Sequence, residues 1–151
     1  VCDSIGGQRS QVLRLSAKAT ESTLIHDSEE LQITAIPIPH VNERFKTSVE
    51  HFGYLVQTGD QRILHLGDAA PHAGLFGQLL RQYTDIDVLI CPAWFVVYES
   101  GLRIIRQANP GQLIVTHIPN GEEQEYSTQF NSSAQPTVFF THKGQKVSLM
   151  E

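Results

Sequence analysis

Three apolar stretches of this sequence each end in a residue that can bind a metal ion, and the chain breaks directly afterwards. His40 closes "ITAIPIPH", Asp68 closes "ILHLGD", and His117 closes "LIVTH". Imidazole and carboxylate groups are the usual ligands for zinc, iron or manganese in hydrolytic sites. A strand end holds such a ligand rigidly, and a carboxylate can bridge two metal ions that lie about 3.5–4 Å apart. We therefore interpret these three residues as candidate metal ligands.

Each candidate has an alternative interpretation. A histidine at a strand end is often a surface or hydrogen-bonded residue, and Gly67-Asp68 is also a common turn sequence. His51 is an alternative to His40, but "VEHFGYL" places it at the start of a strand. His72 follows Asp68 closely enough to approach the same site, although we do not assign it as a ligand. The other histidines, which we interpret as structural or surface residues, are His26, His65 and His142.

The elements that must position these residues follow from apolar runs and their breaks. Residues 31–40 predict a strand, and the runs "FGYLVQT" and "RILHLGD" predict a hairpin that turns at Gly59-Asp60-Gln61. Downstream, the pattern predicts a helix over 74–83, a strand over 86–92, a helix over 100–109 capped by Ser100, a strand over 112–119 and a last hairpin over 136–150. Strands that are apolar on both faces predict a sheet with helices on one face and another layer on the other.

Composition sets the class of protein. The 151 residues are 40% hydrophobic and 18% charged, which is typical of one globular domain over 1–151. Residues 1–30 are the least patterned and read as a connecting segment with a short helix or strand. The net charge of −5 and the lack of a Lys/Arg cluster disfavour a nucleic-acid partner. No apolar run is long enough to span a membrane, and two distant cysteines favour a reducing compartment such as the cytoplasm.

Three segments in this order, "GYLVQTGDQRILHLGDA", "DIDVLICPA" and "ANPGQLIVTHIP", resemble the second half of the metallo-β-lactamase superfamily. The likeness is to its broad lactonase, phosphodiesterase and phospholipase-like branch and extends over residues 31–119, with "IPIPH" in the place of an upstream histidine motif. The resemblance implies an α+β fold, the αββα four-layer sandwich. This chain would supply roughly one β-sheet and its covering helices.

The resemblance also implies roles for the candidate ligands. His40 matches the third-motif histidine that helps to hold one metal, Asp68 the carboxylate that bridges both metals and is central to catalysis, and His117 the terminal histidine of the second metal. The implied cofactor is a pair of zinc ions, with iron or manganese as alternatives. The implied reaction is attack by a metal-bound hydroxide on an ester, lactone or phosphodiester bond of a small-molecule substrate.

One departure from the family pattern is serious. The hallmark His-x-His-x-Asp-His is absent, since no two histidines of this chain are separated by one residue. We therefore expect the chain to be the carboxyl-terminal part of a longer domain, with the missing amino-terminal half as its partner. The isolated chain should then bind zinc weakly and hydrolyse nothing. The oligomeric state stays open.

Other interpretations concern the surroundings of the site. Arg44 and Lys46, in the polar stretch "VNERFKTSVEH", would meet an anionic substrate if this loop covered a pocket, and the alternative is a solvated loop. Trp94, Phe95 and Tyr98 follow a strand end and either wall the pocket or pack in the core.

Two further function classes compete with the hydrolase. A non-catalytic binding or scaffold module would have the same fold with a degenerate metal site. A receiver-like domain would use Asp68 as a phosphoacceptor, but it needs an acidic pair near its first strand and a later lysine at a strand end, and neither is in a convincing position.

Overall fold

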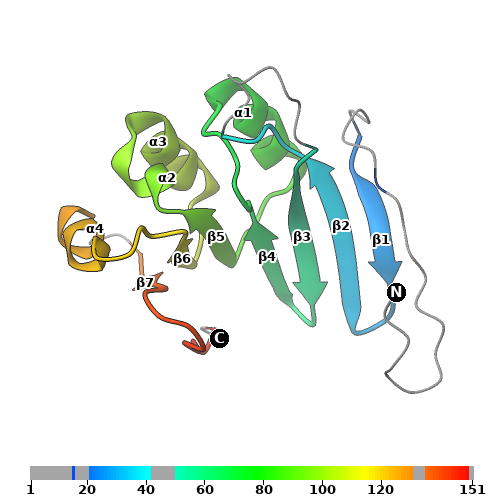
Figure 1. Ribbon diagram of the computed structural model, residues 1–151. Coiled ribbons are helices and arrows are strands. Elements are labelled where there is room, and N and C mark those ends of the chain that lie inside the picture. The colour runs from blue at the N-terminus through cyan, green and yellow to red at the C-terminus, as the bar shows by residue number, and fades with distance from the viewer. Residues whose placement is uncertain (1–14, 16–20, 42–49, 131–134, 150–151) are drawn as a thin grey trace.

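The computed structural model describes residues 15, 21–41, 50–130 and 135–149. In these residues the strands form one seven-stranded sheet, and they lie side by side in the order in which the chain visits them (Figure 1). The strands are β1 (Thr23–Asp27), β2 (Leu31–Pro37), β3 (Phe52–Thr58), β4 (Gln61–His65), β5 (Val88–Pro92), β6 (Gln112–Thr116) and β7 (Thr137–Phe139). The helices are α1 (Ala73–Gln82), α2 (Trp94–Val97), α3 (Glu99–Ala108) and α4 (Glu123–Gln129).

The sheet is antiparallel in its first half and parallel in its second. β1 to β4 pair antiparallel, and β4 to β7 pair parallel with helices in each connection. The predicted β3–β4 hairpin is confirmed, and its turn contains Gly59 at φ +56°, a conformation that glycine adopts without a steric penalty. A mixed sheet with flanking helices agrees with the α+β fold that the family resemblance implies.

One face of the sheet forms the main core with the helices. Leu55, Leu64, Leu89 and Leu113 lie on neighbouring strands in direct register, and all are almost completely buried. They belong to one apolar cluster with helical side chains, in which Phe76 of α1 meets Phe95 of α2 edge to face, with ring centroids 5.7 Å apart. This core holds the strands, and therefore the loops at their ends, in fixed positions.

The opposite face is also apolar but less covered. Ile33, Val56 and Ile63 lie side by side across β2, β3 and β4, one position out of phase with the buried leucines. Because side chains alternate between the two faces of a strand, these three point away from the main core. All three are only half-buried and lie outside the core cluster of the described residues. This is the face on which the sequence predicts another layer.

Most predicted elements are confirmed, with differences at their ends. β2 ends at Pro37 rather than His40, because the prolines stop the ladder and leave His40 in an isolated bridge with Ala69. Ser100 does not cap α3: Tyr98 is the N-cap, so Ser100 lies inside the first turn.

Two short elements, α2 and α4, were not predicted, because they are too short to show a helical period. β1 is a short strand within residues 1–30, which were predicted as a connecting segment with a short helix or strand of unspecified position. The last predicted hairpin is wrong in the described part of the chain: β7 is followed as far as residue 149 by turns and irregular structure, without a second strand. Arg44 and Lys46 lie outside the described residues.

None of the helices in the described ranges is long and apolar enough to cross a membrane.

Candidate metal-binding site

The loops that follow β2 and β4 are joined by backbone hydrogen bonds. The Val41 N–H donates to the Asp68 carbonyl and the Ala70 N–H donates to the Pro39 carbonyl, both at 2.9 Å. These bonds flank the bridge between His40 and Ala69. The backbone of His40 is therefore held beside that of Asp68, although the two residues belong to different loops.

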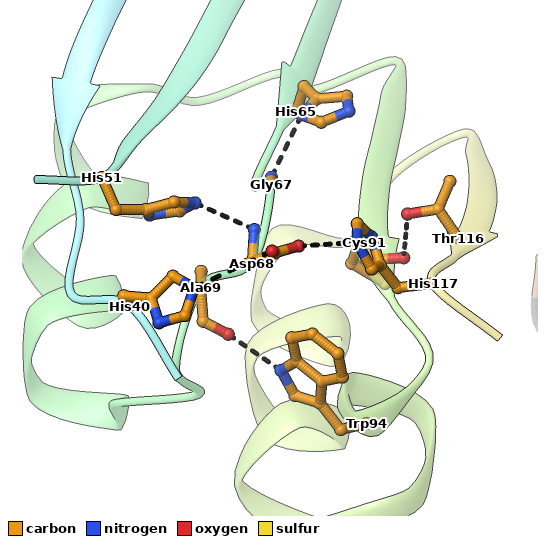
Figure 2. A network of polar contacts seen from close by, with 10 residues as sticks. All are labelled: His40, His51, His65, Gly67, Asp68, Ala69, Cys91, Trp94, Thr116 and His117. Carbon is orange, nitrogen blue, oxygen red and sulfur yellow. Dashed lines mark hydrogen bonds and ion pairs between the residues drawn. The ribbon is translucent and has the colours of Figure 1, made fainter. Parts of the chain in front are cut away.

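The side chains of the three predicted ligands converge on the Asp68 carboxylate. His117 Nε2 lies 3.1 Å from Asp68 Oδ1, and His40 Nε2 lies 3.8 Å from Asp68 Oδ2. Figure 2 shows the two imidazole rings on either side of the carboxylate. The structure thus brings together all three residues, with one imidazole facing each oxygen.

The cluster opens toward solvent on the His117 side. The exposed fraction of the side chain is 17% for His40, 34% for Asp68 and 57% for His117. The exposure of the cluster is therefore greatest at the His117 imidazole, whereas Asp68 Oδ1 itself is buried.

His117 has an unusual backbone conformation. Its φ is +55°, in the left-handed region that costs a residue with a Cβ roughly 1–2 kcal/mol. The preceding strand end is held firmly, since the Ala93 N–H donates to the Thr116 carbonyl at 2.8 Å. The Thr116 hydroxyl also donates to the Cys91 carbonyl at 3.3 Å. Strained residues persist where surrounding structure enforces them, and they concentrate at functional sites.

The donor atoms fit a cation chemically, but the set is incomplete. Asp68 Oδ1 is buried and accepts no hydrogen bond, because the His117 contact is close but not aligned as one. An unsatisfied buried carboxylate oxygen is costly unless a positive charge lies nearby. Among the described residues, however, no group of three or more His, Cys, Asp or Glu side chains is arranged so that it could hold a metal ion. The described residues therefore supply imidazole and carboxylate donor atoms but not a complete group of metal ligands.

Two more histidines hold the turn that carries Asp68. His51 Nε2 accepts the backbone N–H of Asp68 at 2.9 Å, and His65 Nδ1 accepts the backbone N–H of Gly67 at 3.0 Å (Figure 2). Burial and the nearby histidines His117 and His51 lower the pKa of His65, against the opposing effect of Asp68. A neutral imidazole is required here, because only an unprotonated nitrogen can accept a hydrogen bond.

These roles were not apparent from the sequence. His65 was predicted to be structural or on the surface, and its bond to Gly67 is structural. His51 was considered only as a substitute for His40. Its place directly before β3, whose antiparallel pairing with β4 brings the start of β3 beside the end of β4, was the one signal that it lies near the Gly67-Asp68 turn.

The aromatic residues after β5 have separate positions. The Trp94 indole N–H donates to the Ala69 carbonyl at 2.8 Å, and its ring lies tilted beside His117, with centroids 6.0 Å apart. Phe95 is fully buried in the core, whereas Tyr98 is exposed. Only Trp94 therefore borders the cluster.

The remaining candidates are explained locally. His72 caps α1, where its Nδ1 accepts the Leu75 N–H, and His26 and His142 are exposed. Burial raises the pKa of the Cys91 thiol, which keeps it protonated and unsuited to bind a metal.

Comparison with known proteins identifies the fold. The family model of the "Beta-lactamase superfamily domain" matches residues 7–118, which is most of the chain. No curated protein sequence matches.

Solved structures of low sequence identity share the fold. A metallo-beta-lactamase superfamily protein of Thermotoga maritima aligns with a TM-score of 0.52 at 15% identity, over 72% of this chain and 64% of its own. The metallo-beta-lactamase fold protein YhfI of Bacillus subtilis aligns with a TM-score of 0.54 at 14% identity, over 80% of this chain and 48% of its own. Human tRNase Z, short form, aligns with a TM-score of 0.54 at 16% identity, over 86% of this chain and 48% of its own.

The chain thus spans about half the length of most of these structures. The match to the family model covers the strands, helices and loops that bring His40, Asp68 and His117 together. The chain belongs to the beta-lactamase superfamily and has the α+β metallo-β-lactamase fold.

Proposed function

We propose that this chain supplies part of the active site of a metal-dependent hydrolase. His40, Asp68 and His117 are the ligands in this proposal, and Asp68 stands between two metal positions. The substrate is a small molecule with an ester, lactone or phosphodiester bond. The proposal draws on the family and on the hydrolases among its structural neighbours, which include a tRNase by name.

The observation that carries the proposal is the arrangement around the Asp68 carboxylate. Each oxygen faces a different imidazole, and Oδ1 accepts no hydrogen bond. A carboxylate that bridges two cations needs both oxygens available, with further ligands on either side. A purely structural Asp at a turn would more often have its oxygens satisfied by backbone N–H groups.

Each residue has its own task in this proposal. If metal ions are bound, the negative charge of Asp68 would offset part of their charge, and His40 and His117 would supply imidazole nitrogens as ligands. The exposed His117 side admits substrate, while Trp94 excludes water from the adjoining edge. When bound, the metal would lower the pKa of a water molecule and polarise the substrate. Zinc suits imidazole and carboxylate ligands, with iron or manganese as alternatives.

The remaining ligands are proposed to come from a further segment. Three side chains are too few to hold two metal ions, and the chain spans about half the length of most of its structural neighbours. The half-buried face of Ile33, Val56 and Ile63 gives such a segment an apolar surface on which to pack.

Metal analysis of the full-length protein tests the proposal. We expect bound metal by mass spectrometry, and loss of most of it in each of His40→Ala, Asp68→Ala and His117→Ala. His142→Ala is the matched control, because this exposed histidine lies outside the cluster. Unchanged metal content in all three cluster variants would contradict the proposal. The isolated 151 residues should bind zinc weakly and show no turnover, so tight stoichiometric zinc with hydrolysis would overturn the proposed need for further ligands.

The second candidate is a non-catalytic binding module with the same fold. It is favoured by the absence of His-x-His-x-Asp-His from the sequence and of a complete ligand group from the described residues. A full-length protein without bound metal, and without chelator-sensitive stability, would support this candidate over the hydrolase.

A further inference from the structure

His51 contacts both of the loops that carry His40 and Asp68. Its Nε2 accepts the Asp68 backbone N–H at 2.9 Å, and its Nδ1 lies 3.1 Å from the Ile38 carbonyl. A carbonyl oxygen can only accept and a backbone N–H can only donate, so the ring is protonated on Nδ1 and bare on Nε2. One neutral imidazole therefore joins the loop after β2 to the turn after β4.

The ring has little freedom to move. The Ile38 N–H donates to the backbone carbonyl of His51 at 3.2 Å, so Ile38 contacts both the backbone and the ring of this residue. The His40 ring also meets the His51 ring edge on, with centroids 5.5 Å apart. Contacts from Ile38, His40 and Asp68 thus set the position of the ring.

Gly67 shows how closely the turn approaches this ring. A Cβ built on Gly67 would lie 2.6 Å from His51 Nε2, closer than any ordinary contact. The backbone of Gly67 also has φ +56°, in the left-handed region. Because Gly67 has no side chain, the turn can lie in contact with the imidazole, and the Asp68 N–H can donate to it.

We infer that His51 is a positioning residue, which sets the distance and orientation of the Asp68 carboxylate relative to His40. This inference rests on the proposed function, since it concerns the same candidate ligands. His51 acts through the Asp68 backbone and does not contact a substrate. The geometry of ligands in metal sites depends on such supporting hydrogen bonds.

Two amide variants of His51 separate the functions of its two nitrogens. In His51→Gln the side-chain oxygen reaches the position of Nε2 and can accept the Asp68 N–H. In His51→Asn the shorter side chain can replace only the Nδ1 donor. Both variants remove the ring and add an amide, so they are matched in chemistry and differ in reach. His72→Gln is the control for loss of a histidine cap elsewhere.

Hydrogen exchange of the Asp68 amide is the first measurement, made by NMR on the full-length protein without metal. We expect the Asp68 amide to exchange about tenfold faster in His51→Asn than in the wild type, because loss of one hydrogen bond corresponds to about this factor. In His51→Gln and His72→Gln the exchange rate should stay close to that of the wild type. Circular dichroism verifies that each variant is folded. Equal exchange rates in the Asn and Gln variants would overturn the inference.

Zinc affinity is the second measurement, with the ion alone as the probe. We expect about tenfold weaker zinc binding in His51→Asn than in His51→Gln, since loss of a hydrogen bond that orients a metal ligand costs about 10- to 100-fold in affinity. If the Asp68 amide exchanges faster in His51→Asn but the zinc affinity of this variant is unchanged, the positioning role is overturned. Zinc binding that persists in Asp68→Ala would instead overturn the proposed function, whatever the exchange data show.

Discussion

His117 Nε2 lies 3.1 Å from Asp68 Oδ1, and this oxygen has no hydrogen bond from any described residue. The two residues follow β6 and β4, which are separated in the sheet by β5. Parallel strands place their carboxyl ends at one edge of a sheet, so residues distant in the chain meet there. The contact is thus a product of strand order.

Asp68→Asn should remove metal binding but leave the fold almost as stable as the wild type. Asparagine keeps the shape of aspartate and removes its charge, and an ion pair with an exposed histidine contributes at most about 1 kcal/mol. Urea denaturation and metal analysis of the full-length protein provide the two measurements. A loss of stability of several kcal/mol would show that Asp68 is instead a structural residue of the turn.

At His117, glycine should give a more stable protein than alanine, by about 0.5–1 kcal/mol in the free energy of unfolding. The φ of +55° disfavours any residue with a Cβ, and both variants remove the same imidazole. Thr116 provides the matched pair, because it ends β6 in extended backbone and glycine there should be less stable than alanine. If the alanine variant at 117 proved the more stable, the left-handed backbone would be refuted.

Gly67→Ala should destabilise the protein more than Gly59→Ala, by roughly 1–3 kcal/mol. Both glycines have φ +56°, but a Cβ at Gly59 meets nothing within 4 Å, whereas at Gly67 it meets His51 Nε2 at 2.6 Å. The difference in unfolding free energy between the two variants therefore isolates the contact with the His51 ring.

In a His51→Ala background, the difference in unfolding free energy between Gly67→Ala and Gly59→Ala should become smaller. Removal of the ring leaves space for the new methyl group at Gly67 and changes nothing at Gly59. A difference that stays constant in the two backgrounds would show that the cost at Gly67 does not come from His51.

Stability should fall below neutral pH in part because of His65. Its pKa is lowered in the folded protein, so the unfolded chain binds more protons near the ordinary value of 6.5. The contribution of His65 is therefore complete above about pH 6.5 and is lost as the pH falls toward its lower folded pKa.

His65→Asn tests this pH dependence. The asparagine oxygen can accept the Gly67 N–H in place of Nδ1, and the amide does not titrate. Unfolding free energies measured from pH 7.5 to 5.5 should decline less steeply in this variant than in the wild type. Parallel curves would exclude His65 as a source of the decline.

Local patterns were enough to predict much of this fold. The hairpin at Gly59-Asp60, the helix of α1 and the apolar runs of β5 and β6 each contain their own signal, because burial and turn chemistry act on neighbours in the chain. The helices α2 and α4 were not predicted, and within residues 1–30 only an unplaced short helix or strand was expected where β1 lies. All three elements are short and have no such signal. Their formation depends on the sheet and helices beside them.

The sequence by itself determined that apolar strands lead into His40, Asp68 and His117, and hence that these three residues are candidates. Only the tertiary structure decided that one imidazole faces each carboxylate oxygen, and that His51 and His65 accept hydrogen bonds from the backbone of the Gly67-Asp68 turn. The reason is physical. A strand end is specified by residues adjacent in the chain, whereas a distance between loops depends on the pairing of strands and on hydrogen bonds to backbone groups, which side-chain patterns do not record.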